Sequence, residues 1–241
     1  MNKTKKINIA LVGLGNIGSY LYKYLQNNKK ILSKKNNCIP NISYVSAKNQ
    51  LKKRGFKINK KKWLKNYLTA TKKKDVDLIV ELIGGAEGPA KKLVFEALKN
   101  KKHVVTANKA LIAKYGDKLA KIAEKNKVNL EFEASVCGGV PIIRSLKEGL
   151  IANKIQKIYG ILNGTSNYIL SSMDKEKKDF AEVLNSAKKL GYAEANPSAD
   201  INGDDVSAKL KILTSLCFNS FLNKNIHVEG ISKIDSIDID N

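Results

Sequence analysis

An acidic residue and a lysine provide the most specific chemistry in this 241-residue sequence. The stretch GDDVSAKLKIL places Asp204 and Asp205 side by side, with Lys209 four residues after the second. Residues four apart lie on the same side of an α-helix, so Asp205 and Lys209 can form an ion pair. The stretch alone leaves two interpretations: a solvent-exposed pair worth about 0.3–0.5 kcal/mol, or a proton-transfer pair with Lys209 as the reacting group.

The helix predicted to begin near Asp204 continues the face of this pair with Ile212 and Leu216. Because both are apolar, the pair stands at the head of a stripe that packs into the protein. An ammonium in such a place can stabilise the alkoxide formed when a hydride reaches an aldehyde carbon, and can also supply the proton. We therefore favour proton transfer, which requires a hydride donor bound elsewhere in the chain.

A glycine-rich loop near the N-terminus predicts the binding site of such a donor. The sequence INIALVGLGNIGSYLYKYL has Gly13, Gly15 and Gly18 in GxGxxG spacing, after an apolar run and before a helical pattern. Gly13 allows the tight turn, Gly15 lets the backbone approach a pyrophosphate, and Gly18 lets the helix pack on the strand. Glycine-rich turns also occur for packing reasons, but the strand-loop-helix context favours dinucleotide binding.

The helix after the glycine loop has two expected functions. We assign Asn16 and Ile17, in its first turn, to the cofactor site. We also expect Ile17, Leu21 and Leu25 to form the buried stripe of this helix, because they follow each other at intervals of four residues.

The ends of later strands indicate which dinucleotide binds. The second strand ends in YVSAKNQLKKR, where Lys48 replaces the acidic residue that would hold the ribose hydroxyls of NAD, so NADP is favoured over NAD. Gly84 and Gly85 bring bare backbone to the end of the third strand. Lys109 follows the fourth strand, where it is a candidate cation for the cofactor or the substrate; the alternative for both lysines is a solvated surface position.

The composition limits the class of protein. The net charge is +22, which is typical of nucleic-acid-binding proteins, but only Arg54 and Arg144 are arginines among the 44 basic residues. Arginine is favoured for base and phosphate recognition, so we expect a solvated lysine-rich surface and no nucleic-acid partner. No apolar run is long enough to span a membrane, and the N-terminus lacks a signal peptide, which indicates a cytoplasmic protein. Three separated cysteines and two histidines predict neither disulfides nor a zinc site.

The order of apolar runs predicts an α/β fold. Five runs alternate with helical patterns around residues 16–27, 88–99 and 115–126. This is the pattern of a Rossmann-type, doubly wound parallel sheet, covered on both faces. Beyond the SVCGGVP segment the pattern changes to a region richer in helix. We predict a nucleotide-binding domain over 1–134 and a smaller α+β substrate and dimerisation domain, incomplete, over 135–241.

The residues resemble the homoserine dehydrogenase family. The matching stretches, in the expected order over essentially the whole chain, are GLGNIG, ELIGG with a following PA, VVTANKALIA, EASVCGGVPII, GILNGTSNYIL and LGYAEANPSADINGDDVSAKLKIL. The resemblance implies reduction of aspartate 4-semialdehyde to L-homoserine with NAD(P)H, on the branch leading to threonine and methionine. It also implies a homodimer.

The resemblance assigns roles to individual residues. Lys209 would be the catalytic proton donor, Asp205 its acidic companion, and Lys109 a second cation at the reacting oxygen. Substrate binding is implied for Glu194, Tyr192 and Asp200. A site for a monovalent cation, Na⁺ or K⁺, is implied by similarity of the EASVCGGV segment, with Glu133 and the backbone carbonyls of Val136, Gly138 and Val140 as ligands.

Two departures from the family pattern leave alternatives. Lys48 and Asn49 stand where bacterial relatives commonly have an arginine-aspartate pair, which weakens the assignment of NADP. The chain also stops at HVEGISKIDSIDIDN, where bacterial members usually continue. The alternatives are a catalytically silent fragment or subunit that binds cofactor or a partner chain, and another two-domain dehydrogenase of amino acid metabolism.

Overall fold

The computed structural model describes residues 5–218 and 226–240. These belong to two compact units, Met1–Pro141 and Ile142–Asn241. Residues 135–141 therefore lie with the first unit.

The first unit is built on a five-stranded parallel sheet. Its strands are β1 (Lys5–Val12), β2 (Cys38–Ser46), β3 (Leu78–Glu81), β4 (His103–Thr106) and β5 (Leu130–Glu131). The strand order is β2-β1-β3-β4-β5, and every neighbouring pair is parallel. Crossovers run outward in both directions from β1 and β3, which confirms the predicted doubly wound sheet.

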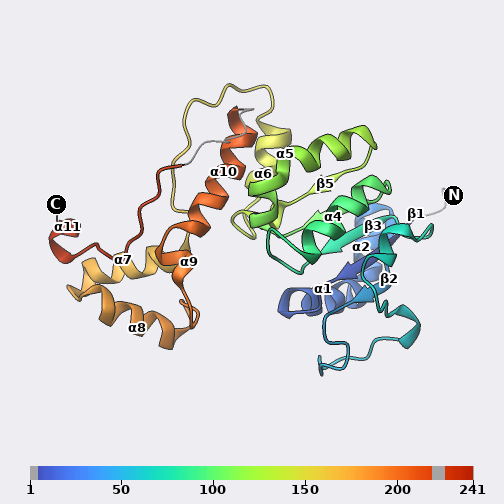
Figure 1. The fold of residues 1–241 in the computed structure, drawn as a ribbon, viewed down its shortest axis with the longest axis horizontal. Helices are drawn as coiled ribbons and strands as arrows, with labels where there is room; N and C mark the ends of the chain where they lie inside the picture. Colours follow the sequence, from blue (N-terminus) through green and yellow to red (C-terminus); the bar gives the residue numbers. More distant parts are fainter. Residues whose placement is uncertain (1–4, 219–225, 241) are drawn as a thin grey trace. The chain divides into compact units, whose positions relative to one another are not determined.

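Helices cover the two faces of this sheet. They are α1 (Asn16–Asn27), α2 (Lys29–Asn36), α3 (Thr69–Lys72), α4 (Pro89–Lys99) and α5 (Lys109–Lys125), with 3₁₀ turns at Lys60–Lys62 and Glu133–Ser135. Figure 1 shows α1 on the opposite side of the strands from α4 and α5. The β1 strand changes from exposed to fully buried toward Val12, so its apolar end lies between the two helical layers and leads directly into the glycine loop.

The predicted buried stripe of α1 is wrong at Ile17. Its side chain is 66% exposed, whereas Gly18 and Tyr22 are the buried residues of the helix. Leu21 and Leu25 are partly buried against the core. The reason is the close contact of Gly18 with the loop, which centres the packed face of the helix on Gly18 and Tyr22 and turns Ile17 outward.

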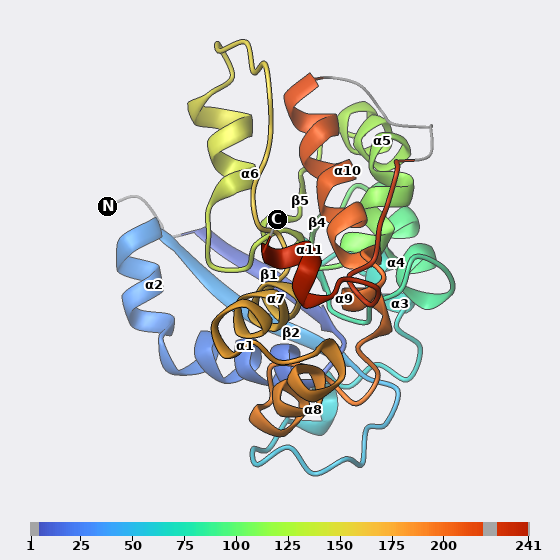
Figure 2. The ribbon, with the colours of Figure 1, turned by 90° about the vertical axis from the view of Figure 1, so that its left-hand side faces the viewer.

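The described part of the second unit is helical. Its elements are α6 (Ile142–Arg144), a π-helical turn (Ser145–Gly149), α7 (Gly164–Glu176), α8 (Phe180–Leu190), α9 (Ser198–Ile201), α10 (Asp204–Phe218) and α11 (Ser236–Asp240). The antiparallel pair α7 and α8, side by side in Figures 1 and 2, encloses a small core around Ile169, Met173 and Val183. Residues 142–218 and 226–240 contain no strand, so the β part expected of this unit is not formed among them.

Two further features bear on the class of protein. No helix among the described residues is both long and apolar enough to cross a membrane. All three cysteines are free thiols, and burial raises the pKa of Cys217, which keeps that thiol protonated at neutral pH.

Candidate active site

The Asp205–Lys209 pair lies on one face of α10, as its spacing predicts. The Lys209 ammonium is 2.7 Å from Asp205 Oδ2, and the two side chains are only 16% and 7% exposed. The ammonium also donates to the backbone carbonyl of Leu162, with Nζ and O 2.6 Å apart. In a fully exposed pair, water would satisfy the remaining N–H groups of the ammonium. Here a second protein acceptor does so, which supports an oriented, largely desolvated cation over a surface ion pair.

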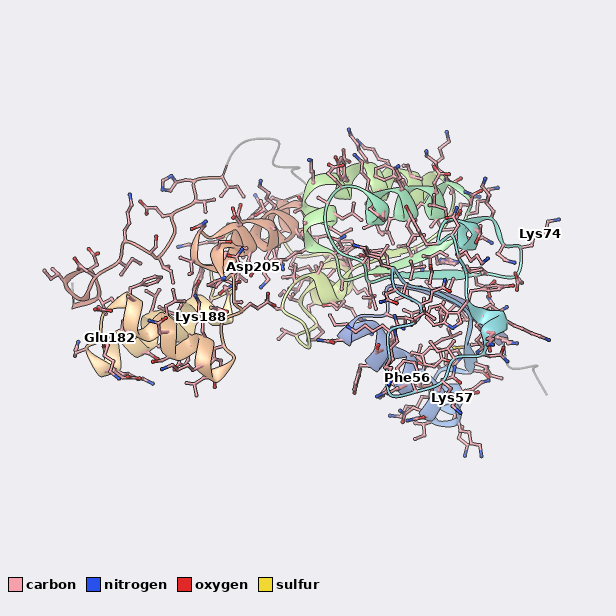
Figure 3. The ribbon with its side chains drawn as sticks, turned by 60° about the horizontal axis from the view of Figure 1, so that its bottom comes forward. Phe56, Lys57, Lys74, Glu182, Lys188 and Asp205 are labelled. Carbon is pink, nitrogen blue, oxygen red and sulfur yellow. The ribbon has the colours of Figure 1, made fainter. Side chains whose placement is uncertain are left out.

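Asn163 joins two acidic side chains of this cluster. Its buried side-chain amide donates to Asp205 Oδ2 at 2.9 Å and to Asp200 Oδ1 at 2.7 Å. Its side-chain oxygen accepts the amide of Ser166 and caps the N-terminus of α7. Asp200, Asp205 and Lys209 are therefore brought together, and Figure 3 shows Asp205 near the start of α10.

The expected substrate residues Tyr192 and Glu194 lie on the loop after α8. The Tyr192 ring stacks on Tyr168 of α7 at a centroid distance of 4.4 Å. Its carbonyl accepts a hydrogen bond from the Thr165 hydroxyl at 2.7 Å. These two contacts hold Tyr192 of the loop against α7. The nearby Glu194 is exposed to solvent and open to a ligand.

Sequence reasoning missed Asn163 and the Leu162 carbonyl. The NGTSN segment indicates a turn, and an asparagine directly before a helix is a preferred N-cap. That signal predicts the role of its side-chain oxygen. It does not predict the two bonds from its amide, because these reach residues 37 and 42 positions further along the chain.

The glycine loop has the geometry of a phosphate-binding turn. Gly13 has φ of +102°, and a Cβ there would lie 2.3 Å from the Leu82 carbonyl oxygen. A Cβ on Gly18 would lie 1.9 Å from the Gly13 carbonyl oxygen, so the helix begins in direct contact with the turn. A Cβ on Gly15 would meet no protein atom within 4 Å. Gly15 therefore leaves an open approach to the N-terminus of α1, which suits a pyrophosphate.

Alanine at Gly15 and at Gly18 should have separable effects. Gly18→Ala forces a methyl group into backbone and is expected to destabilise the fold by about 1–3 kcal/mol. Gly15→Ala meets no neighbour, so its free energy of unfolding should change by less than about 0.5 kcal/mol, whereas its methyl group would displace a bound dinucleotide. Urea unfolding and NADPH titration by fluorescence test this pair. Equal losses of stability in both variants would contradict it.

A buried carboxylate orders the loops at the carboxyl edge of the sheet. Glu81, at the end of β3, is fully buried and accepts hydrogen bonds from the amides of Ile83 and Gly84 at 2.7 and 3.0 Å. It also accepts the hydroxyl of Thr106 at 2.5 Å. Gly84 and Gly85 have φ of +87° and +80°, so this carboxylate holds two glycines in a left-handed turn next to the strand ends.

The same network reaches the start of α5. Asn108 donates from its side chain to the carbonyl of Gly85 at 2.7 Å, and its backbone amide donates to the hydroxyl of Thr106. Its side-chain oxygen accepts the amide of Leu111 and caps the helix. Lys109 is the first residue of α5, so this cap fixes its backbone at the same edge of the sheet as the glycine turn.

A surface cluster ties the loop after Gly85 to α5. Glu87 pairs with Lys114 at 2.8 Å and with Lys91 at 2.9 Å, and accepts the hydroxyl of Tyr115. Hydrogen bonds from Lys114, then Tyr115, then Lys91 lower the pKa of Glu87 to about 2. The carboxylate is therefore ionised throughout the physiological pH range, and this tie is lost only as the pH falls toward 2.

The cations after β2 differ in their availability to a ligand. Arg54 donates to the carbonyls of Leu14, Asn49, Gln50 and Lys52, so its guanidinium is used to order the glycine loop and the loop after β2. Lys48 follows the strand end and is exposed. Of these two cations, Lys48 is the one open to a ligand phosphate.

The EASVCGGV segment forms a turn in the first unit. Cys137 and Gly139 have φ of +49° and +90°, and the amide of Val140 donates to the carbonyl of Cys137 at 2.8 Å. This hydrogen bond uses the carbonyl of Cys137, which is not one of the expected backbone ligands of the cation. Those are the carbonyls of Val136, Gly138 and Val140.

Comparison with known proteins indicates one family over both units. Residues 13–133 match the family model of the homoserine dehydrogenase NAD binding domain, and residues 141–241 match that of homoserine dehydrogenase. A homoserine dehydrogenase of Neisseria gonorrhoeae is 44% identical over 98% of this chain. The chain spans 54% of that relative, about half its length.

Solved structures show the same similarity. A homoserine dehydrogenase from Thiobacillus denitrificans superposes with a TM-score of 0.88 at 40% identity, over 97% of this chain and 54% of that one. A hyperthermophilic archaeal homoserine dehydrogenase in complex with NADPH superposes with a TM-score of 0.83 at 26% identity, over 96% of this chain and 76% of that one.

Proposed function

Because this chain belongs to the homoserine dehydrogenase family, we propose that it carries out the NAD(P)H-dependent reduction of L-aspartate 4-semialdehyde to L-homoserine. The observation that carries the proposal is the Lys209 ammonium, which is held between a carboxylate and a backbone carbonyl and is 16% exposed. The glycine loop of the first unit supplies the second requirement, a site for the nicotinamide cofactor.

The proposed catalytic residues have distinct tasks in this reaction; Asp205 and Lys209 on α10 belong to the second unit and Lys109 to the first. The bound cofactor supplies the hydride. Lys209 stabilises the negative charge that develops on the aldehyde oxygen and donates a proton to it. Asp205 orients the ammonium through their ion pair. Lys109 is the proposed second cation at the reacting oxygen.

The test is NADPH oxidation by the purified chain with aspartate semialdehyde, with NADH in a parallel series. We expect turnover and a lower KM for NADPH, since Lys48 can pair with the 2′-phosphate and no acidic residue stands at that strand end. Similar KM values for the two cofactors would remove the preference for NADP but leave the reaction standing. NADPH binding without turnover would instead indicate a silent subunit that needs a second polypeptide.

Glu194 is the proposed partner of the substrate ammonium, with Tyr192 and Asp200 in the same pocket. A carboxylate there distinguishes an amino acid aldehyde from a simple aldehyde. Glu194→Gln should raise the KM for aspartate semialdehyde by about tenfold or more, because one charge-assisted hydrogen bond contributes roughly 1.5–3 kcal/mol. The KM for NADPH should not change. Glu182→Gln on α8 is the matched control, and an unchanged substrate KM in Glu194→Gln would exclude this role.

A monovalent cation, Na⁺ or K⁺, is proposed to bind Glu133 and the carbonyls of Val136, Gly138 and Val140. The bound cation is expected to stabilise the turn that these residues form. Comparing thermal stability in NaCl, KCl and tetramethylammonium chloride tests this site, and equal stability in all three salts would exclude it.

We also propose that the protein is a homodimer in the cytoplasm. Sedimentation tests the oligomeric state, and cell fractionation tests the location.

A further inference from the structure

The positive charge of this protein is concentrated in the first third of the sequence. Residues 1–74 contain 20 of the 44 basic residues and none of the 22 acidic residues, whereas the rest of the chain is close to neutral. Asp75 and Asp77, the first acidic residues, come directly after this stretch. A lysine bias spread evenly over the whole surface does not account for such a division.

The fold places this stretch at one edge of the parallel sheet. It supplies β1, α1, α2, β2, the 3₁₀ turn Lys60–Lys62 and α3. Because β2 is the edge strand and β1 is its neighbour, these elements form one side of the first unit, blue to cyan in Figures 1 and 2. Residues 5–74 thus form the acid-free edge of this unit, and the separation of charge along the sequence produces a positive potential on one side of it.

The cations of the acid-free edge have no carboxylate partners. None of their side chains forms an ion pair with another described residue. Lys6, Lys29 and Lys62 come from β1, α2 and the 3₁₀ turn and lie close enough to repel one another. Partial burial lowers the pKa of Lys62, and the charges of Lys29 and Lys6 lower it further. This repulsion opposes the compact fold, and a bound anion would relieve it.

Two exposed tyrosines lie within this positive surface. Tyr20 and Tyr24, about one turn apart on α1, are 69% and 43% exposed. Their rings stack on each other, with centroids 6.0 Å apart and planes inclined by 21°. Lys23 stands between them in the sequence, and its ammonium lies 5.4 Å from the centre of the Phe56 ring. Proteins bind single-stranded nucleic acids with such a combination, because bases stack on exposed rings while cations follow the phosphates.

A nucleic acid fits this surface better than other polyanions do. Stable membrane binding combines basic charge with a lipid anchor or an inserted amphipathic helix, and the lysine-rich helix α2 has only 8 residues. An acidic peptide would use the lysines but leave the stacked rings without a partner. The scarcity of arginine argued against a nucleic-acid partner, but that reason concerns base-specific contacts. Binding to phosphates that is independent of sequence needs only positive charge, which lysine supplies.

We propose that the acid-free edge binds single-stranded nucleic acid. Lysines of α2, of the 3₁₀ turn and of the loop after β2 contact the phosphates, and bases stack on Tyr20 and Tyr24. Recognition is independent of base sequence, because Arg54, the one arginine of this stretch, is bound to backbone carbonyls. The strand binds outside the glycine loop and Lys48, so the inference does not depend on the proposed reaction.

The test is fluorescence anisotropy of a labelled oligouridylate of about 20 nucleotides, longer than the usual site of a single-strand-binding domain. At about 50 mM salt we expect a dissociation constant of about 10⁻⁵ M or lower. Contacts to about four phosphates should weaken binding roughly 50-fold when the salt is raised to about 200 mM, because bound counterions are released. Saturating NADPH should not displace the oligonucleotide.

Two charge reversals separate the acid-free edge from the net charge. The side chains of Lys29 on α2 and Lys118 on α5 are both exposed, and both belong to the first unit. Lys29→Glu and Lys118→Glu change the net charge equally, but only the first alters the acid-free edge. Lys29→Glu should weaken oligouridylate binding and lower its salt dependence by about one phosphate contact. Lys118→Glu should bind as the unaltered chain does.

Replacing both exposed tyrosines tests the stacking of bases. The double variant Tyr20→Ala and Tyr24→Ala should weaken oligouridylate binding about tenfold or more, the usual contribution of base–aromatic stacking. Its affinity for heparin, a polyanion without bases, should not change. Circular dichroism checks that all variants are folded.

Four results would overturn the proposal: no oligouridylate binding at the lower salt concentration, equal weakening by the two charge reversals, unchanged binding after loss of both tyrosines, or displacement by NADPH. The last would place the oligonucleotide in the dinucleotide site. Tighter binding to phosphatidylserine vesicles than to oligouridylate would likewise overturn it and assign the surface to a membrane. Because no measurement here uses turnover, failure of the proposed reaction would leave this inference standing.

Discussion

Replacing Lys209 by alanine is expected to lower turnover by about 10²- to 10⁴-fold, the usual contribution of a positioned general acid. The variant removes an ammonium that is bound both to Asp205 and to the Leu162 carbonyl. The developing alkoxide then loses its proposed proton donor, and only Lys109 is left as a proposed cation at that oxygen. The measurement is kcat for NADPH oxidation with aspartate semialdehyde, compared between the variant and the unaltered chain.

Cofactor affinity and amine rescue distinguish catalysis from structure. The Kd for NADPH should stay unchanged in Lys209→Ala, and a small primary amine added to the assay should restore part of kcat. Lys211→Ala, on the same helix, should behave as the unaltered chain does. A parallel loss of NADPH binding, with no rescue by amines, would mean that Lys209 only holds the backbone at Leu162.

Replacing Asp205 by alanine should destabilise the second unit by about 3 kcal/mol, near the lower end for breaking a buried pair. Asp205 is 7% exposed, and its carboxylate accepts both the Lys209 ammonium and the Asn163 amide. Removing it leaves the ammonium with only the Leu162 carbonyl among these partners. The midpoint of thermal unfolding, followed by helical circular dichroism, measures the loss.

The neighbouring acid provides the matched control. Asp204 is exposed in the first turn of the same helix, so Asp204→Ala should lose only the interaction with the helix dipole, less than about 1 kcal/mol. Trp63 belongs to the first unit and reports on it by fluorescence. Equal destabilisation by the two substitutions would show that Asp205 contributes as a helix-terminal charge and not as the partner of Lys209.

Much of the first unit follows from short stretches of sequence. The apolar runs that end at Val12, Glu81 and Thr106 predict buried parallel strands, and each is a strand in the structure. The GxGxxG spacing predicts the turn between β1 and α1, because its conformations and contacts exclude a side chain at Gly13 and Gly18. Such signals are local, since they depend on backbone conformation and on periodicity within about twenty residues.

The error at Ile17 shows the limit of periodicity. Spacing by four residues correctly indicated that α1 has an apolar face, but several neighbouring faces are compatible with the residues present. The contact between Gly18 and the carbonyl of Gly13 decided which one packs on the sheet. A rotation of about one residue, 100° around the helix, was enough to expose Ile17.

The sequence by itself determined that Asp205 and Lys209 share a helix face, because four residues make about one turn. Only the tertiary structure decided that they are shielded from solvent, that Leu162 provides the second acceptor, and that Asn163 links Asp205 to Asp200. These contacts join residues 37–47 positions apart. Their formation depends on how α7, α9 and α10 pack, and no local pattern specifies the path of the chain between them.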